Sequence, residues 1–143
     1  MRRCRRLCSI AQRTTFGGVE NIYAPPLWLI VLGAVLTALA VAVFLYAWPP
    51  SRDRRRIVVG AVAAVAAFLT WRVALIIANG ANLDVDYPVL LGLSFEDIGS
   101  GVMAFLFAAL AFGLGADRAQ PAQLVVKCAA LVGGGAILVD RFV

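Results

Sequence analysis

The sequence contains no histidine, and this absence removes several kinds of site at once. Without histidine the chain lacks the usual general base of enzymes, the commonest metal ligand and the axial ligands of a bis-histidine haem. It also contains no Gly-x-Ser-x-Gly elbow and no phosphate-binding loop that ends in Gly-Lys-Ser or Gly-Lys-Thr. We therefore predict no cofactor and no metal site, and the sequence favours a protein that is not an enzyme.

Cysteine is also scarce, and the three cysteines do not form a ligand set. Cys4 and Cys8 lie among arginines near the start of the chain, with no second pair of ligands to complete a zinc site. Cys128 lies inside an apolar run, where a small buried side chain is the simplest expectation.

Long apolar runs dominate the remaining sequence, which is 62% hydrophobic with a mean hydropathy of +0.90. The runs cover residues 27–48, 57–78, 98–116 and 124–139. Arg72 and Lys127 are the only charged residues within them. A helix of about 20 apolar residues crosses the hydrocarbon core of a bilayer. We therefore predict an all-α fold, a four-helix transmembrane bundle in a multi-pass protein of the cell membrane.

Proline, glycine and polar residues suggest where the elements begin and end. Pro49-Pro50 cannot continue a helix, and Ser94-x-x-Asp97 is typical of a helix start. The expected organisation is a basic N-terminal segment, 1–24, and a single membrane domain, 25–143. Within that domain we expect helices at 26–48, 57–79, 95–116 and 121–140.

The N-terminal segment contains five arginines and no acidic residue in residues 1–18, which leaves three interpretations open. It is a cytoplasmic tail, a transit peptide for an organellar membrane, or an extended start before a true beginning near Tyr23. The basic loop 51–56 and the acidic loop 79–97 favour the first loop in the cytoplasm and both termini outside. The N-terminal arginines favour the reverse. We interpret the basic charge as contact with lipid headgroups, and not with nucleic acid.

Arg72 is the candidate for a functional or structural charge inside the membrane. It precedes Ala78 by six residues, which places it about 9 Å inside the end of the second helix. One hypothesis is an anion-binding or gating charge that faces a cavity. The other is a structural ion pair at the interface, with Glu96, Asp97 and Asp140 as possible partners on the same side.

The leading functional hypothesis is a non-catalytic accessory subunit or a homo-oligomeric membrane component. Its motivation is a set of small residues at helical spacing, which let helices approach closely and favour a protein partner or self-association. The set comprises Gly60, Ala64 and Ala67 together with the pairs 104/108, 111/115, 129/133 and 130/134.

Two alternatives remain at this stage. One is a small transporter or channel that uses Arg72 in an interhelical cavity. The weaker one is a membrane enzyme that uses the acidic loop 79–97. We expect Lys127, about a turn inside the fourth helix, to extend its ammonium group to the nearby interface.

Overall fold

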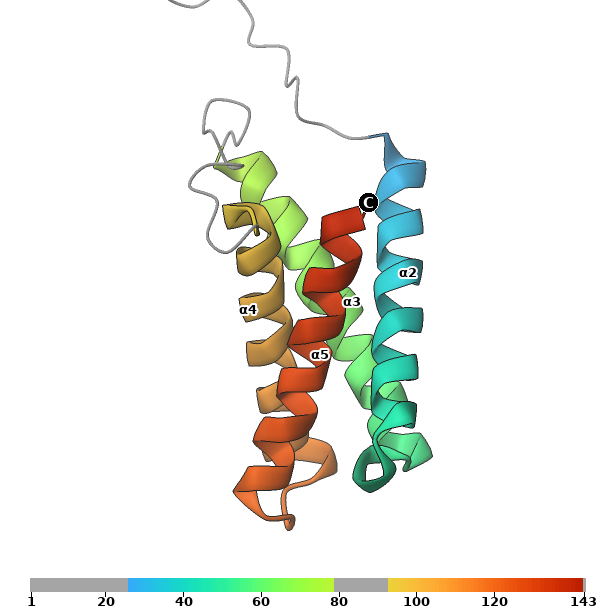
Figure 1. The fold of residues 1–143 in the computed structure, drawn as a ribbon. Helices are drawn as coiled ribbons and strands as arrows, with labels where there is room; N and C mark the ends of the chain where they lie inside the picture. The colour runs from blue at the N-terminus through green and yellow to red at the C-terminus, as the bar shows by residue number, and fades with distance from the viewer. Residues whose placement is uncertain (1–25, 79–92, 143) are drawn as a thin grey trace, which may run out of the picture.

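The computed structural model describes residues 26–78 and 93–142 of the chain. Every regular element in those two ranges is helical, as predicted (Figure 1). The long helices are α2 (Leu27–Ala47), α3 (Arg54–Ile77), α4 (Phe95–Ala111), which the π-helical turn η3 (Phe112–Ala116) extends, and α5 (Ala122–Phe142). Each of the four, with η3 counted as part of the third, is long and apolar enough to cross a membrane.

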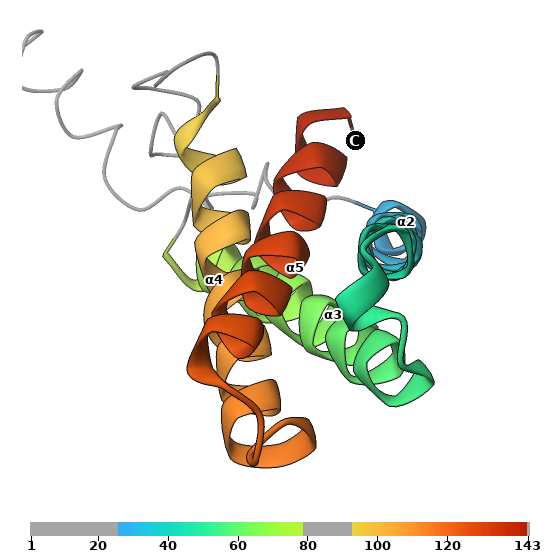
Figure 2. The ribbon, with the colours of Figure 1, turned by 60° about the horizontal axis from the view of Figure 1, so that its bottom comes forward.

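Consecutive long helices run in opposite directions (Figure 1). At one end of the bundle α2 and α4 begin while α3 and α5 end, and we call it the Arg72 end. At the other, the Arg56 end, α2 and α4 end while α3 and α5 begin. α5 packs against the other three helices, and Figure 2 shows it between α4 and α2 with α3 crossing behind.

Prolines limit α2 on both sides. Pro26 occupies the N-cap position, where its missing N–H group costs nothing. After Ala47 the backbone of Trp48 is extended, and Pro49-Pro50 then begins the 3₁₀ turn η1 (Pro49–Ser51) that leads to α3.

α3 begins at Arg54, so the expected start at residue 57 was wrong. The reason is the side chain of Asp53, which accepts a hydrogen bond of 3.3 Å from the backbone N–H of Arg55 and caps the helix. Hydrophobicity alone placed the start at the first apolar residue, Ile57. The helix ends at Ile77, and residue 79, where its end was expected, lies outside the described residues.

The predicted start of the third helix is confirmed. The backbone N–H of Ser94 donates to Oδ2 of Asp97 at 2.8 Å, and the N–H of Asp97 donates to Oγ of Ser94 at 3.1 Å. This capping box satisfies two backbone donors and holds the Glu96 and Asp97 carboxylates in the first turn of α4, where the helix dipole favours them.

The interior of the bundle is built from small and medium apolar side chains. Its buried residues are Val41, Leu45, Ala63, Ala64, Ala67, Ala104, Ala108, Phe112, Cys128, Ala129, Val132 and Ala136. The one buried polar residue along α2, Thr37, donates to the carbonyl oxygen of Gly33 on the same helix at 2.8 Å. Its hydroxyl is therefore satisfied without a partner on another helix.

Two glycines set the close approach of α4 and α5. A Cβ atom on Gly133 would lie 2.9 Å from the carbonyl oxygen of Gly101. A Cβ atom on Gly101 would overlap the side chain of Ile137. The two backbones thus meet where neither residue has a side chain, as small-residue contacts between apolar helices require.

Candidate functional site

The guanidinium of Arg72 joins three helices at the Arg72 end. Nη1 donates to Oε1 of Glu96, in the first turn of α4, and Nη2 donates to Oδ1 of Asp140, near the end of α5, at 3.1 Å. The side chain of Asp140 is 3% exposed, and those of Arg72 and Glu96 are mostly buried. We call these three residues the Arg72 cluster. Because each nitrogen bonds a different helix, the planar guanidinium acts as a bridge that a single ammonium group does not reproduce.

Antiparallel packing explains why these residues meet. Arg72 precedes the end of α3 at Ile77 by five residues, or about 7.5 Å along the helix axis. α4 begins at the end of the bundle where α3 stops (Figure 1), which brings Glu96 near. α5, the fourth span, also ends there, with Asp140 two residues before its last residue, Phe142.

Aromatic side chains surround the Arg72 cluster. The Arg72 guanidinium carbon lies 5.2 Å from the ring centroid of Phe68, one turn earlier on α3, which is a cation–π distance. The indole of Trp71 occupies the space above Gly99, where it would overlap an added Cβ atom. It also contacts the ring of Phe95, with centroids 6.3 Å apart. The end of α3 is thus held against the first turns of α4 by packing as well as by charge.

Two buried oxygen atoms, on Ser100 of α4 and Asp140 of α5, add to the polar character of this end. Ser100 is 2% exposed, and its hydroxyl lies beside the Asp140 carboxylate. The contact falls outside hydrogen-bond geometry, so Oγ of Ser100 and Oδ2 of Asp140 have no hydrogen-bond partner among the described residues. Buried polar atoms without partners are uncommon in folded proteins, and they distinguish this place from the apolar core of the bundle.

Asp97 is not a partner of Arg72 in the structure, although the sequence named it as one of three candidates. Its carboxylate accepts the backbone N–H of Ser94 in the capping box and is 4% exposed. Glu96, the neighbouring acid, points to the arginine instead. The two adjacent acids therefore divide two tasks between them: one caps α4 and the other binds Arg72.

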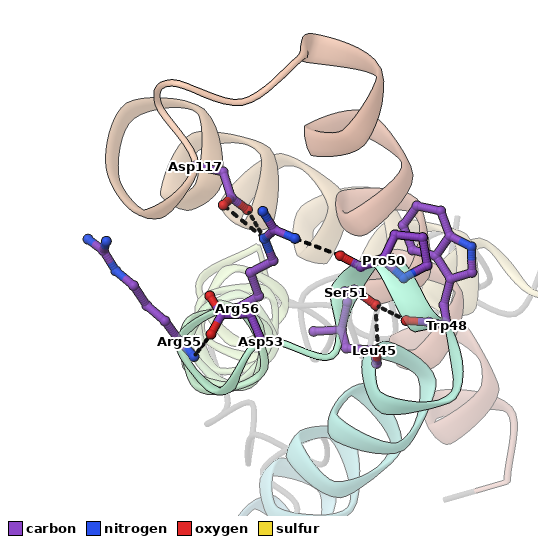
Figure 3. A network of polar contacts seen from close by, with 8 residues as sticks. All are labelled: Leu45, Trp48, Pro50, Ser51, Asp53, Arg55, Arg56 and Asp117. Carbon is purple, nitrogen blue, oxygen red and sulfur yellow. Dashed lines mark hydrogen bonds and ion pairs between the residues drawn. The ribbon is translucent and has the colours of Figure 1, made fainter.

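A second ion pair lies at the Arg56 end and was not foreseen. Nε of Arg56 donates to both carboxylate oxygens of Asp117, at 2.9 Å and 2.8 Å (Figure 3). Nη1 of the same guanidinium donates to the carbonyl oxygen of Pro50 at 2.6 Å. The side chains of Arg56 and Asp117 are 12% and 5% exposed. This pair ties the start of α3 to the turn after η3 and to the α2–α3 connection.

The α2–α3 connection also satisfies the last carbonyl groups of α2. The hydroxyl of Ser51, which is fully buried, donates to the carbonyl oxygen of Leu45 and lies 2.9 Å from that of Trp48 (Figure 3). Nε of Arg52 donates to the carbonyl oxygen of Tyr46 at 2.7 Å. Orphan carbonyls at a helix end are costly in an apolar setting, so Ser51 and Arg52 have a structural reason to follow Pro49-Pro50.

The packing of the bundle uses most of the predicted small-residue strips internally. Gly60, Ala64 and Ala67 are buried, and so are both members of the 104/108 and 129/133 pairs. Gly115 and Gly134 instead face open space, because a Cβ atom on either residue would have no neighbouring atom within 4 Å. The pair 130/134 lies on the outer face of α5, with both residues exposed.

The chemistry available at these sites is limited. Among residues 26–78 and 93–142, no group of three or more acidic or cysteine side chains could hold a metal ion. Both ion pairs place their charges against each other, and neither includes a nucleophile. Cys128 is buried in the apolar core, as expected, whereas Cys4 and Cys8 lie outside the described residues. No known protein family, curated protein or solved structure matches this chain.

Proposed function

We propose that the chain is a multi-pass protein of the cell membrane that serves as a non-catalytic component of a membrane assembly, either as an accessory subunit or as a homo-oligomer. The four long helices supply the length and apolar composition that four spans need. Lipid replaces water around such helices, so the partner in every case includes the bilayer itself.

Large apolar side chains cover the outside of the bundle, which supports the membrane location. Val31, Val35 and Leu39 on α2 are each at least half exposed, and Leu110 on α4 and Val58 on α3 are similar. A soluble bundle would need a polar stripe on its outer face. The polar contacts of the described residues instead concentrate at the two ends.

The charge difference between the two ends favours the Arg56 end in the cytoplasm. The described residues at that end include six basic and two acidic side chains: Arg52, Arg54, Arg55, Arg56, Arg118 and Lys127 against Asp53 and Asp117. At the Arg72 end two basic side chains stand against three acidic ones: Arg72 and Arg141 against Glu96, Asp97 and Asp140. Residues 1–25, with the N-terminal arginines, lie outside the described part of the chain.

The single observation that supports a non-transporting component is the apolar interior between the two ion pairs. Between the two ends of the described helices no buried side chain is charged, and the buried polar residue there, Thr37, bonds to its own helix. A conducting path would need polar groups at these levels. On α3, the hydroxyl of Thr70 donates to the carbonyl oxygen of Ala66 on the same helix at 2.7 Å, so its hydrogen atom needs no partner on another helix.

Mass measurement of the protein from its native membrane tests this proposal. Alkaline extraction should leave the chain in the membrane pellet, because four apolar spans do not dissolve in buffer. Gentle detergent extraction followed by native mass spectrometry should then yield a discrete species heavier than the 15.2 kDa monomer. A chain that appears in the alkaline supernatant, or a bare monomer in every mild detergent, contradicts the proposal.

One observation favours a second candidate, a transporter or channel that uses Arg72. Asp140, which binds Arg72, and the neighbouring Ser100 each have a buried oxygen without a hydrogen-bond partner among the described residues, and a transported ion would find polar groups there. Against it, both terminal nitrogens of the guanidinium already bond carboxylates. Ion flux through reconstituted vesicles separates the two candidates. The enzyme hypothesis gains no support, and most of loop 79–97 lies outside the described residues.

A further inference from the structure

A groove opens on the surface at the Arg56 end, between the end of α2 and the first turns of α5. Its volume is about 390 Å³, and it is lined by Trp48, Lys127, Ala130 and Leu131. Most of the lining is apolar, and among the described lining residues only the exposed Lys127 is charged. An apolar groove with a cation at its edge is complementary to a ligand that combines a long apolar part with an anionic group.

Lys127 has no carboxylate partner among the described residues. The two acids described at this end are both in use, because Asp117 binds Arg56 and Asp53 caps α3. The described side chains at this end are mostly basic. α3 begins with three arginines, whose positive charges are unfavourable next to the positive N-terminal end of the helix dipole. The excess positive charge is therefore not neutralised within the described structure.

The position of Lys127 fits a lipid headgroup. It lies five residues after the start of α5 at Ala122, or about 7.5 Å into the helix. Trp48, at the C-cap of α2, lies on the other side of the same groove. Tryptophan and lysine at the end of a span are the residues that occupy the boundary between headgroups and acyl chains.

The surface next to the groove has room for an acyl chain. Ala130 forms part of the lining, and Gly134, one turn further along α5, is exposed with open space where a Cβ atom would lie. The outer face of α5 therefore has little or no side chain at two successive turns. The neighbouring Leu138 and Val126 project from the same face, with about half of their surface exposed.

We propose that this groove binds an anionic phospholipid, with the phosphate at Lys127 and an acyl chain over Ala130 toward Gly134. The inference rests on the membrane location proposed above. It is independent of whether the chain acts as an accessory subunit or as a homo-oligomer.

The test is native mass spectrometry of the full chain in mild detergent with phosphatidylglycerol or phosphatidylcholine added. The wild type should retain phosphatidylglycerol preferentially. Lys127→Gln should weaken that retention about fivefold, the factor that corresponds to about 1 kcal/mol for one basic contact. Lys127→Arg should preserve it. Arg118→Gln removes the same charge at the same end outside the groove and should change retention by less than about twofold. Ala130→Phe should reduce retention with every charge intact.

Several outcomes would overturn the inference. Equal retention of the two lipids shows that the groove has no headgroup preference. Equal effects of Lys127→Gln and Arg118→Gln reduce the preference to general surface charge. A bound polypeptide that Ala130→Phe displaces, with lipid retention unchanged, shows that a protein covers the groove. A chain that is soluble without detergent refutes the membrane location itself, which is a distinct result.

Discussion

Replacing Arg72 with leucine should strongly destabilise the bundle. The change removes the guanidinium that bonds Glu96 on α4 and Asp140 on α5, and leaves two mostly buried carboxylates near each other. Removing one partner of a buried ion pair costs about 3–5 kcal/mol. Folded domains are stable by only about 5–15 kcal/mol, so Arg72→Leu should remove a large share of the free energy of unfolding.

The size of the effect can be measured by unfolding the protein in mild detergent with increasing sodium dodecyl sulfate while following helicity by circular dichroism. Arg72→Lys should fall between wild type and Arg72→Leu, because one ammonium group does not span both carboxylates. Arg72→Leu combined with Asp140→Leu should recover part of the loss, since the most buried carboxylate is then absent as well. Arg141→Gln, an exposed arginine at the same end, should stay within about 0.5 kcal/mol of wild type.

An unfolding midpoint for Arg72→Leu equal to those of wild type and Arg141→Gln would refute this reasoning. In that case the guanidinium would contribute nothing to the stability of the bundle. The contacts with Glu96 and Asp140 would then need another purpose, and the transport candidate would gain weight.

Three further substitutions test the packing and the second ion pair. Gly133→Ala should destabilise the protein by about 1–3 kcal/mol, because the new Cβ atom would lie 2.9 Å from the carbonyl oxygen of Gly101. Gly134 faces open space, so the control Gly134→Ala should be neutral or slightly stabilising. The same unfolding titration measures both, and equal midpoints would show that α4 and α5 do not approach as closely as described. Asp117→Asn should lower stability by about 2–4 kcal/mol, because the mostly buried Arg56 loses its counter-charge. A wild-type midpoint for this variant would mean that the Pro50 carbonyl and solvent suffice for Arg56.

The sequence predicted the helices well because length and hydrophobicity define them directly. It also contained the start of α4, since Ser94 and Asp97 have the spacing of a capping box. The prediction was wrong at the start of α3, because the first three residues of the helix are arginines and not apolar. Asp53 caps the helix before them. Hydrophobicity places a helix boundary at the first apolar residue, but hydrogen bonds determine where the helix begins.

The ion pairs were predictable only in part. Antiparallel helices bring Arg72, Glu96 and Asp140 to one end, so topology alone narrowed the partners. It did not decide between Glu96 and Asp97, although the capping pattern was the signal that Asp97 was already in use. The pair of Arg56 with Asp117 was missed because Arg56 was counted among the loop arginines. Asp117 is the only acid in the turn after the third span, and topology places that turn beside the arginines.

The contact between Gly101 and Gly133 could not be predicted. Alanine and glycine recur throughout the apolar runs, so small-residue spacings arise in many registers. Only the three-dimensional packing shows which strips are used inside the bundle and that Ala130 and Gly134 remain on the surface.

Ion flux through reconstituted vesicles tests the central claim most directly, namely that Arg72 holds the helices together and does not serve transport. Purified wild type and Arg72→Lys would be placed in vesicles that contain proton-sensitive and chloride-sensitive dyes. The account predicts that flux through wild-type vesicles equals that of empty vesicles. Flux above that level in the wild type, abolished in Arg72→Lys while the variant remains folded, would contradict it.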